Sequence, residues 1–202
     1  MTALARDDAD TRAARVAAVR QTTDALKEVL GRGEVGRPEL EEAKGLLMRL
    51  AEKRELFGAE DFPLPDPDAE KNNALYLLAA EDEPALSLYL QVSGSGLDVP
   101  PHNHKTWAII AGIDGIEENR FYDRTAEGPQ RSGGQEVGPG SAVAFEPEDL
   151  HSIHIHGQDY VLNFHMYGIP LDKLYGREYW HAGSGEWRLF PVQQGIVDRR
   201  DG

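Results

Sequence analysis

The apolar positions of the first 60 residues repeat at helical spacing, whereas those further along the chain do not. Between residues 8 and 30 the larger apolar side chains lie three, four or seven apart, and glycines follow at 31 and 33. Pro38, a residue suited to a first helical turn, begins a second such pattern that continues to Leu50. We therefore expect a helical pair in residues 1–60, packed on a domain formed by residues 61–202.

The pattern of apolar and polar residues changes after residues 62–68, a linker in which three of five consecutive residues are proline. Short apolar runs now alternate with Gly-, Pro- and Asp-containing turns, which is typical of all-β domains. The predicted strands are 75–80, 86–92, 106–113, 117–124, 141–145, 151–156 and 161–167. This spacing predicts an all-β core, closed or sandwiched into a barrel. For residues 171–180 both a short helix and an extended cover remain open.

Composition narrows the classes of function. The net charge of −14 argues against nucleic acid and anionic membrane surfaces as partners. The chain has no cysteine, so a metal would be held by His, Asp or Glu, which suits iron, manganese, nickel or zinc. No apolar run approaches 18 residues and the first residues lack a signal-peptide pattern, so we expect a cytoplasmic protein. The oligomeric state is left open.

Histidine spacing gives the main chemical signal. His102 and His104 alternate on an extended segment, so both point to one face, and His151 follows 47 residues later on another predicted strand. Three imidazoles from two strands would hold one metal ion and leave coordination positions open for substrate and oxygen. His154 and His156 have the opposite parity from His151. They are interpreted either as solvated side chains or as groups that support the site.

The spacing Gly96-x5-His102-x-His104-x3-Ala108-x6-Gly115 resembles the first sequence motif of the cupin superfamily. Ala108 stands where most cupins have a metal-binding Glu. The resemblance covers roughly residues 72–170. It implies a double-stranded β-helix, a jelly-roll-like barrel, preceded here by the helical pair.

The second cupin motif, which supplies the last histidine ligand, is matched loosely by Gly140, Pro147 and His151. One residue is inserted before the proline, and the later Asn of the family is missing. Because the Glu ligand is lost as well, the site resembles that of the thiol dioxygenases, cysteine dioxygenase and 3-mercaptopropionate dioxygenase. These enzymes bind ferrous iron and add both atoms of O2 to a thiol, giving a sulfinate. The resemblance implies Fe(II), with nickel, manganese or zinc as alternatives, and a small thiol and O2 as substrates.

Residues 163–168 resemble the Ser-x-His-x-Tyr motif of the same enzymes. The resemblance implies that Tyr167 donates a hydrogen bond to iron-bound oxygen and that His165 orients Tyr167. Asn163 replaces the Ser, and its amide can bond to an imidazole. A purely structural polar network is the alternative interpretation of these three residues.

Substrate recognition is less clearly encoded. Cysteine dioxygenase carries a carboxylate-binding arginine on an early barrel strand, but residues 74–78 contain none. The mercaptopropionate enzymes place an arginine shortly after the family tyrosine, and Arg177 lies ten residues after Tyr167. Arg177 is therefore expected to bind a substrate carboxylate, with a surface position as the alternative.

Other side chains are assigned by default. Trp107 and Tyr76 either line a substrate pocket or pack in the core, Arg120 and Arg124 are expected to pair with nearby carboxylates, and His181 is expected to be structural. Two rival functions stay open beside the thiol dioxygenase: a cupin oxygenase or isomerase that acts on a non-thiol molecule, and a non-catalytic cupin that binds a ligand.

Overall fold

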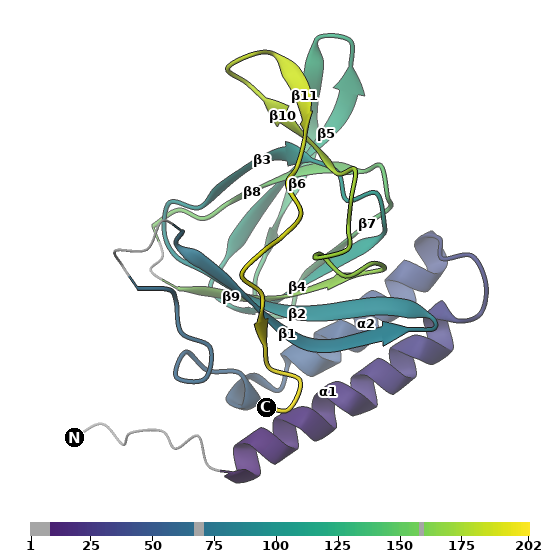
Figure 1. Cartoon of the computed structure of the whole chain (residues 1–202), viewed down its shortest axis with the longest axis vertical. Coiled ribbons are helices and arrows are strands. Elements are labelled where there is room, and N and C mark those ends of the chain that lie inside the picture. Colours follow the sequence, from purple (N-terminus) through teal and green to yellow (C-terminus); the bar gives the residue numbers. More distant parts are fainter. Residues whose placement is uncertain (1–8, 67–70, 158–159) are drawn as a thin grey trace.

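The computed structural model describes residues 9–66, 71–157 and 160–202. Within them, helices α1 (Ala9–Leu30) and α2 (Arg37–Ala51) and a 3-10 turn, η1 (Arg54–Leu56), precede the strands (Figure 1). The predicted helical pair is thus present, and Pro38 lies in the first turn of α2. None of the helices in these ranges is long and apolar enough to cross a membrane.

All seven predicted strands are present, and five more join them. In chain order the strands are β1 (Asn73–Asp82), β2 (Ala85–Ser93), β3 (Asp98–His102), β4 (Ala108–Asp114), β5 (Glu117–Thr125), β6 (Gly128–Val137), β7 (Ala142–Phe145), β8 (Leu150–His154), β9 (Val161–Tyr167), β10 (Glu178–His181), β11 (Glu186–Leu189) and β12 (Val197–Asp198). The open question about residues 171–180 is settled in favour of extended chain, because they enter β10 without a helix.

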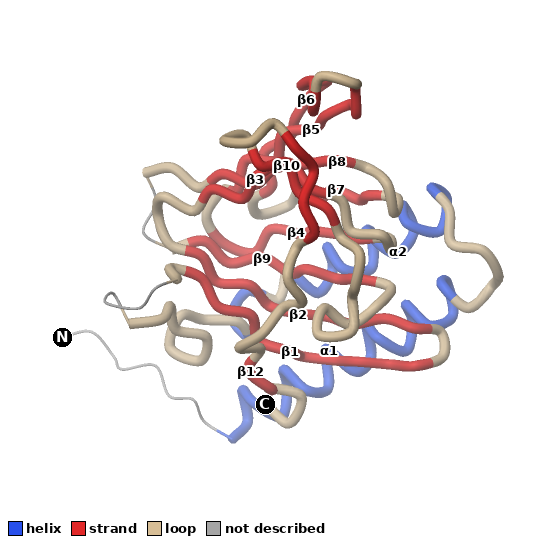
Figure 2. Tube along the Cα trace, turned by 45° about the horizontal axis from the view of Figure 1, so that its top comes forward, coloured by secondary structure: helices blue, strands red, loops and turns tan. Residues whose placement is uncertain are grey.

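The strands form two six-stranded sheets. Sheet A has the order β12-β1-β2-β9-β4-β7, and sheet B has the order β11-β10-β3-β8-β5-β6. The sheets face each other, and α1 and α2 lie along the outer face of sheet A (Figure 2). The hairpins β5–β6 and β10–β11 extend beyond the barrel at one end (Figure 1). This is the jelly-roll-like fold class that the sequence predicted.

Two hydrophobic cores result, one on each face of sheet A. The first joins leucines of α1 and α2, such as Leu26 and Leu47, to the outward side chains of the sheet. The second lies between the sheets and contains Ala108, Ile110 and Tyr167. Alternation along β9 therefore sends Phe164 to the helices and leaves its neighbours inside the barrel.

The proline-rich segment is not a free linker where the structure describes it. Phe62 is fully buried in the helix-facing core. The hydroxyl of Tyr76 donates to the Pro63 carbonyl at 2.6 Å, and that of Tyr160 donates to the Phe62 carbonyl at 3.0 Å. The segment lacks helix and strand, as its prolines predict, but packing holds it against the barrel. Residues 67–70 lie outside the described part of the chain.

Candidate metal centre

Three histidines converge inside the barrel. His102 ends β3, His104 follows in the next loop, and His151 lies on β8, where it is the register partner of His102. One ligand atom from each lies within 4.8 Å of those of the other two. The Nε2 atoms of His104 and His151 are 3.3 Å apart. All three side chains are buried, so the structure brings together the three residues predicted as metal ligands.

The local chain shape depends on Pro100 and Pro101. Proline lacks the N–H that a strand ladder needs, and the register of β3 against β8 shifts between Val99 and His102. Beyond His104, Lys105 has a left-handed φ of 56°, which a non-glycine residue adopts only where its surroundings hold it. The Lys105 N–H donates to the Pro147 carbonyl at 2.9 Å. The irregular strand end thus aims both histidines into the barrel.

Hydrogen bonds fix two of the three rings. Nδ1–H of His102 donates to the Pro100 carbonyl at 2.9 Å, and Nδ1–H of His151 donates to Oδ1 of Asn119 at 2.7 Å. Nδ1 of His104 is buried without a partner in the described residues. A proton on Nδ1 leaves the Nε2 lone pair free, and this is how proteins orient imidazole ligands toward a metal.

Burial keeps these imidazoles neutral. It lowers the pKa of His102 to about 4, and it holds the pKa values of His104 and His151 well below the ordinary value. Neutral imidazole is the form that binds iron, nickel or zinc. In the described residues no carboxylate belongs to this group of ligand atoms, and Ala108 packs inside the barrel. The donor set therefore fits a divalent transition metal, whose full positive charge would be retained.

A cavity of about 370 Å³ lies beside the triad. Its lining includes His102, His165, Tyr167 and Arg177. Arg177 is only 7% exposed, its guanidinium lies 5.0 Å from the ring centroid of Phe190, and its Nε has no hydrogen-bond partner in the described residues. Burial lowers the pKa of this guanidinium. A buried cation without a carboxylate partner is costly, so the cavity suits an anionic group.

Tyr167 and His165 meet in the same cavity. The Tyr167 hydroxyl lies 3.1 Å from Nδ1 of His165. Burial raises the pKa of Tyr167, so its hydroxyl stays protonated and can donate a hydrogen bond at neutral pH. The ring centroid of Tyr167 is 5.4 Å from that of His104. The phenol thus lines the cavity and lies next to one of the candidate metal ligands.

The predicted bond between Asn163 and His165 is not formed. In the described residues neither Oδ1 of Asn163 nor Nε2 of His165 has a hydrogen-bond partner. The Asn163 amide instead donates at 3.0 Å to Glu117, which comes from β5 in the facing sheet. His165 Nε2 lies 3.7 Å from the same carboxylate oxygen.

Glu117 and Asn119 are site residues that the sequence analysis missed. Both are fully buried, and the Asn119 amide donates to Glu117 at 2.9 Å while its oxygen accepts from His151. A hydrogen-bonded path therefore links a candidate metal ligand to a buried carboxylate. The available signal was the parity of residues 117–124, where Glu118 and Arg120 pair with each other and alternate with these two residues.

Several predicted residues lie elsewhere. Tyr76 and Trp107 belong to the helix-facing core, so the structure does not bring them to the cavity. The indole of Trp107 packs so closely on Gly168 that a Cβ there would lie 2.5 Å from Nε1. Arg120 makes two 2.7 Å hydrogen bonds to Glu118, and Arg124 pairs with Glu178. His181 bonds to Ser184 at 2.9 Å in a turn.

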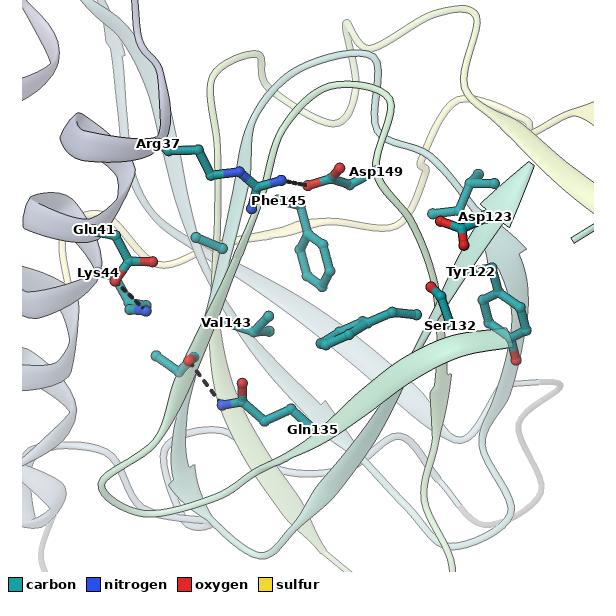
Figure 3. Close-up of a pocket in the computed structure, with 14 residues that line it drawn as sticks. Arg37, Glu41, Lys44, Tyr122, Asp123, Ser132, Gln135, Val143, Phe145 and Asp149 are labelled. Atoms are coloured by element: carbon teal, nitrogen blue, oxygen red, sulfur yellow. Dashed lines mark hydrogen bonds and ion pairs between the residues drawn. The ribbon is translucent and has the colours of Figure 1, made fainter. Parts of the chain in front are cut away.

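A second cavity, of about 340 Å³, lies between α2 and strands β5, β6 and β7 (Figure 3). Four of its charged residues form two ion pairs, Arg37 with Asp149 and Lys44 with Glu41. Phe145 lines it, and the same ring packs 4.2 Å from the ring of His151. Phe145 is therefore a wall between this cavity and the triad, and no histidine lines the cavity.

Known proteins resemble the chain in fold. No family model matches it. Similar solved structures include oxalate oxidase in complex with the substrate analogue glycolate, with 15% identity, a TM-score of 0.43, and coverage of 56% of this chain and 59% of that one. KdgF from Halomonas sp. has 18% identity, a TM-score of 0.41, and coverage of 58% and 96%. The Cupin_2 domain of an XRE family transcriptional regulator from Enterobacter cloacae has 13% identity and a TM-score of 0.37, and the match covers 48% of this chain and 97% of that one. Likeness at this level carries no argument about activity.

Proposed function

We propose that the protein is a non-haem Fe(II) thiol dioxygenase, which converts a small thiol carrying a carboxylate to its sulfinate with O2. The observation that carries the proposal is the shared cavity. His102 of the buried three-histidine group lines it together with Tyr167 and Arg177, whose Nε has no hydrogen-bond partner in the described residues. The reaction balances without a further reactant: one RSH and one O2 give one RSO2H.

The metal ligands favour a thiol. Three neutral imidazoles leave the charge of a divalent ion uncompensated, which favours an anionic thiolate donor. Bound Fe(II) would supply the oxygen chemistry. His102, His104 and His151 would hold it, and Asn119 would keep the His151 ring in the tautomer that presents Nε2.

Arg177 would hold the other end of the substrate. A guanidinium binds a carboxylate through two parallel hydrogen bonds, and the buried setting strengthens them. Two fixed ends align the sulfur, which lowers the entropic cost of the reaction. A carboxylate within a short chain of the thiol, as in 3-mercaptopropionate, fits a cavity of about 370 Å³.

Tyr167 would serve the reacting atoms as a hydrogen-bond donor. Its phenol stays protonated, and His165 positions it from two residues away on the same strand. A fixed donor in a site screened from water stabilises charge that develops on oxygen.

The proposal is tested by anaerobic loading with Fe(II), followed by O2 uptake and mass spectrometry on 3-mercaptopropionate, cysteine and cysteamine. We expect one sulfinate per O2, with preference for the thiols that carry a carboxylate. Arg177→Gln should lower kcat/KM for 3-mercaptopropionate about 100-fold, chiefly through KM, because the carboxylate loses a charged partner. It should leave cysteamine, which has no carboxylate, little affected.

Arg124→Gln is the matched control, since Arg124 pairs with Glu178 and does not line the cavity. Absence of sulfinate from every thiol would refute the proposal. Turnover of a sulfur-free carboxylate by the same loaded protein would favour the rival cupin oxygenase instead.

A further inference from the structure

The chain contains a second His-x-His pair, which the proposed reaction does not use. His154 ends β8 and His156 follows it, three and five residues beyond the inner ligand His151. This odd separation places them on the outer face of sheet B. Asp98, the first residue of β3, is the register partner of His154 and lies beside it.

We propose that Asp98, His154 and His156 form a second, solvent-facing site for a divalent transition metal of the zinc, nickel or copper class. One ligand atom from each lies within 4.8 Å of those of the other two. Two imidazoles and a carboxylate are a donor set that these ions favour. Asp98 and His156 are exposed, so water completes the coordination.

The ring of His154 is already held as a ligand ring would be. Its Nε2 lies 2.7 Å from Oγ of Ser152, which is fully buried and 3.0 Å from the hydroxyl of Tyr122. Nδ1 of His154 faces Oδ1 of Asp98 at 2.5 Å. A metal on Nδ1 moves the ring proton to Nε2, and the Ser152 hydroxyl can accept that bond as readily as it donates one.

The adjustment that a metal requires falls on mobile groups. Tetrahedral ligands lie roughly 3–3.5 Å from each other, so Asp98 must withdraw slightly from His154. Its side chain is 63% exposed, so solvent offers room for this shift. The rings of His154 and His156 lie nearly parallel, at 21°, with centroids 5.9 Å apart. The metal replaces the proton shared by His154 and Asp98, so the carboxylate stays paired with a cation.

A second carboxylate lies near the outer cluster but is already paired. Glu118 on β5 is the other register partner of His154, and it pairs with Arg120 at 2.7 Å and with Arg131 at 3.4 Å. The order Ser152, His154, Asp98 is also that of a hydrolase relay. Ser152, however, is fully buried in the middle of a strand, so no substrate can reach its hydroxyl. Metal binding is the chemistry that this exposed cluster can perform.

The test is titration of the metal-free full chain with Zn2+ alone, followed by calorimetry and by metal analysis after dialysis. We expect two equivalents on the wild type and one on His156→Gln, which alters an exposed side chain and leaves the fold intact. His154→Ala should likewise bind one. Conversely, His102→Ala should lose the inner equivalent and keep the outer one. His181→Ala changes a partly exposed histidine outside both sites and should still bind two.

Affinity at the outer site should fall at least about 100-fold in Asp98→Asn and in His156→Gln. At tenfold zinc excess, a single wild-type equivalent that His102→Ala abolishes would overturn the proposal. So would a second equivalent that survives unchanged in both His156→Gln and Asp98→Asn, because that metal would be bound elsewhere. Unfolding midpoints of the metal-free variants check that each one is folded.

Discussion

The inner and outer histidine clusters share a sequence pattern but differ in their surroundings. His102-x-His104 points into the barrel, where a backbone carbonyl and a buried amide fix the rings of His102 and His151. His154-x-His156 lies on the outer face, next to an exposed carboxylate. The two clusters meet on one strand, β8, where the parity of a residue decides which side it faces. Burial, more than ligand spacing, separates a site that can exclude water from one that cannot.

The largest expected difference between the two faces of sheet B comes from substitutions at two adjacent positions on β8. His151→Ala removes an inner ligand, and we expect the inner metal to be lost and thiol oxidation to fall at least about 10³-fold. Ser152→Ala, on the opposite face, should keep the inner metal and its activity within about twofold. Metal analysis and O2 uptake on both variants measure this. Equal losses in the two variants would show that the faces are not independent.

The second test uses pH, because burial makes the inner cluster proton-sensitive. The pKa of His102 is about 4 in the folded protein and 6.5 when exposed, so the unfolded state binds the proton more tightly. The stabilising contribution is full above pH 6.5 and disappears as pH falls toward 4. It amounts to about 3 kcal/mol for the metal-free protein.

Urea unfolding of the metal-free wild type and of His102→Gln, between pH 7 and 4.5, isolates this contribution from that of the carboxylates. The wild type should lose more stability than the variant as pH falls. Parallel pH profiles for the two proteins would contradict the assignment to His102.

The smallest expected effect is on metal affinity, and it comes from the amide that holds the ring of His151 in place. Asn119→Ala frees the His151 ring, and the affinity for the inner metal should fall about 10-fold to 100-fold. Asn163→Ala is the matched control, because its amide binds Glu117 and no metal ligand. Competition with a chelator measures both affinities. An affinity loss in the control as large as that in Asn119→Ala would assign the effect to the whole network rather than to one bond.

Much of the fold could be predicted from periodicity, and the exceptions have physical causes. β3 was missed because Pro100 and Pro101 argue against a strand, yet a register shift accommodates them. β6 was missed because seven of its ten residues are exposed, so no apolar alternation marks it. The short strands β10 to β12 form at the sheet edges, where long-range pairing rather than local pattern decides.

The candidate site likewise contains residues that local pattern could predict and residues that it could not. Alternation sufficed to place His165 and Tyr167 in one cavity, and the His-x-His spacing grouped His102 with His104 although His104 lies in the loop after β3. It did not suffice for Tyr76, because sheet A is covered on both faces and its strands are apolar on both. Nor could it identify the partner of Asn163, since Glu117 comes from the opposite sheet. Such contacts depend on tertiary packing that no local pattern records.

β9 carries a further consequence for how the protein can be engineered. Its residues His165 and Tyr167 line the cavity, and its even residues Leu162, Phe164 and Met166 pack in the helix-facing core. The helices therefore brace the backbone that sets the position of the phenol. A truncated protein that begins at the barrel would expose this apolar surface to solvent and hold Tyr167 less firmly in place. The N-terminal helices are therefore part of the functional unit.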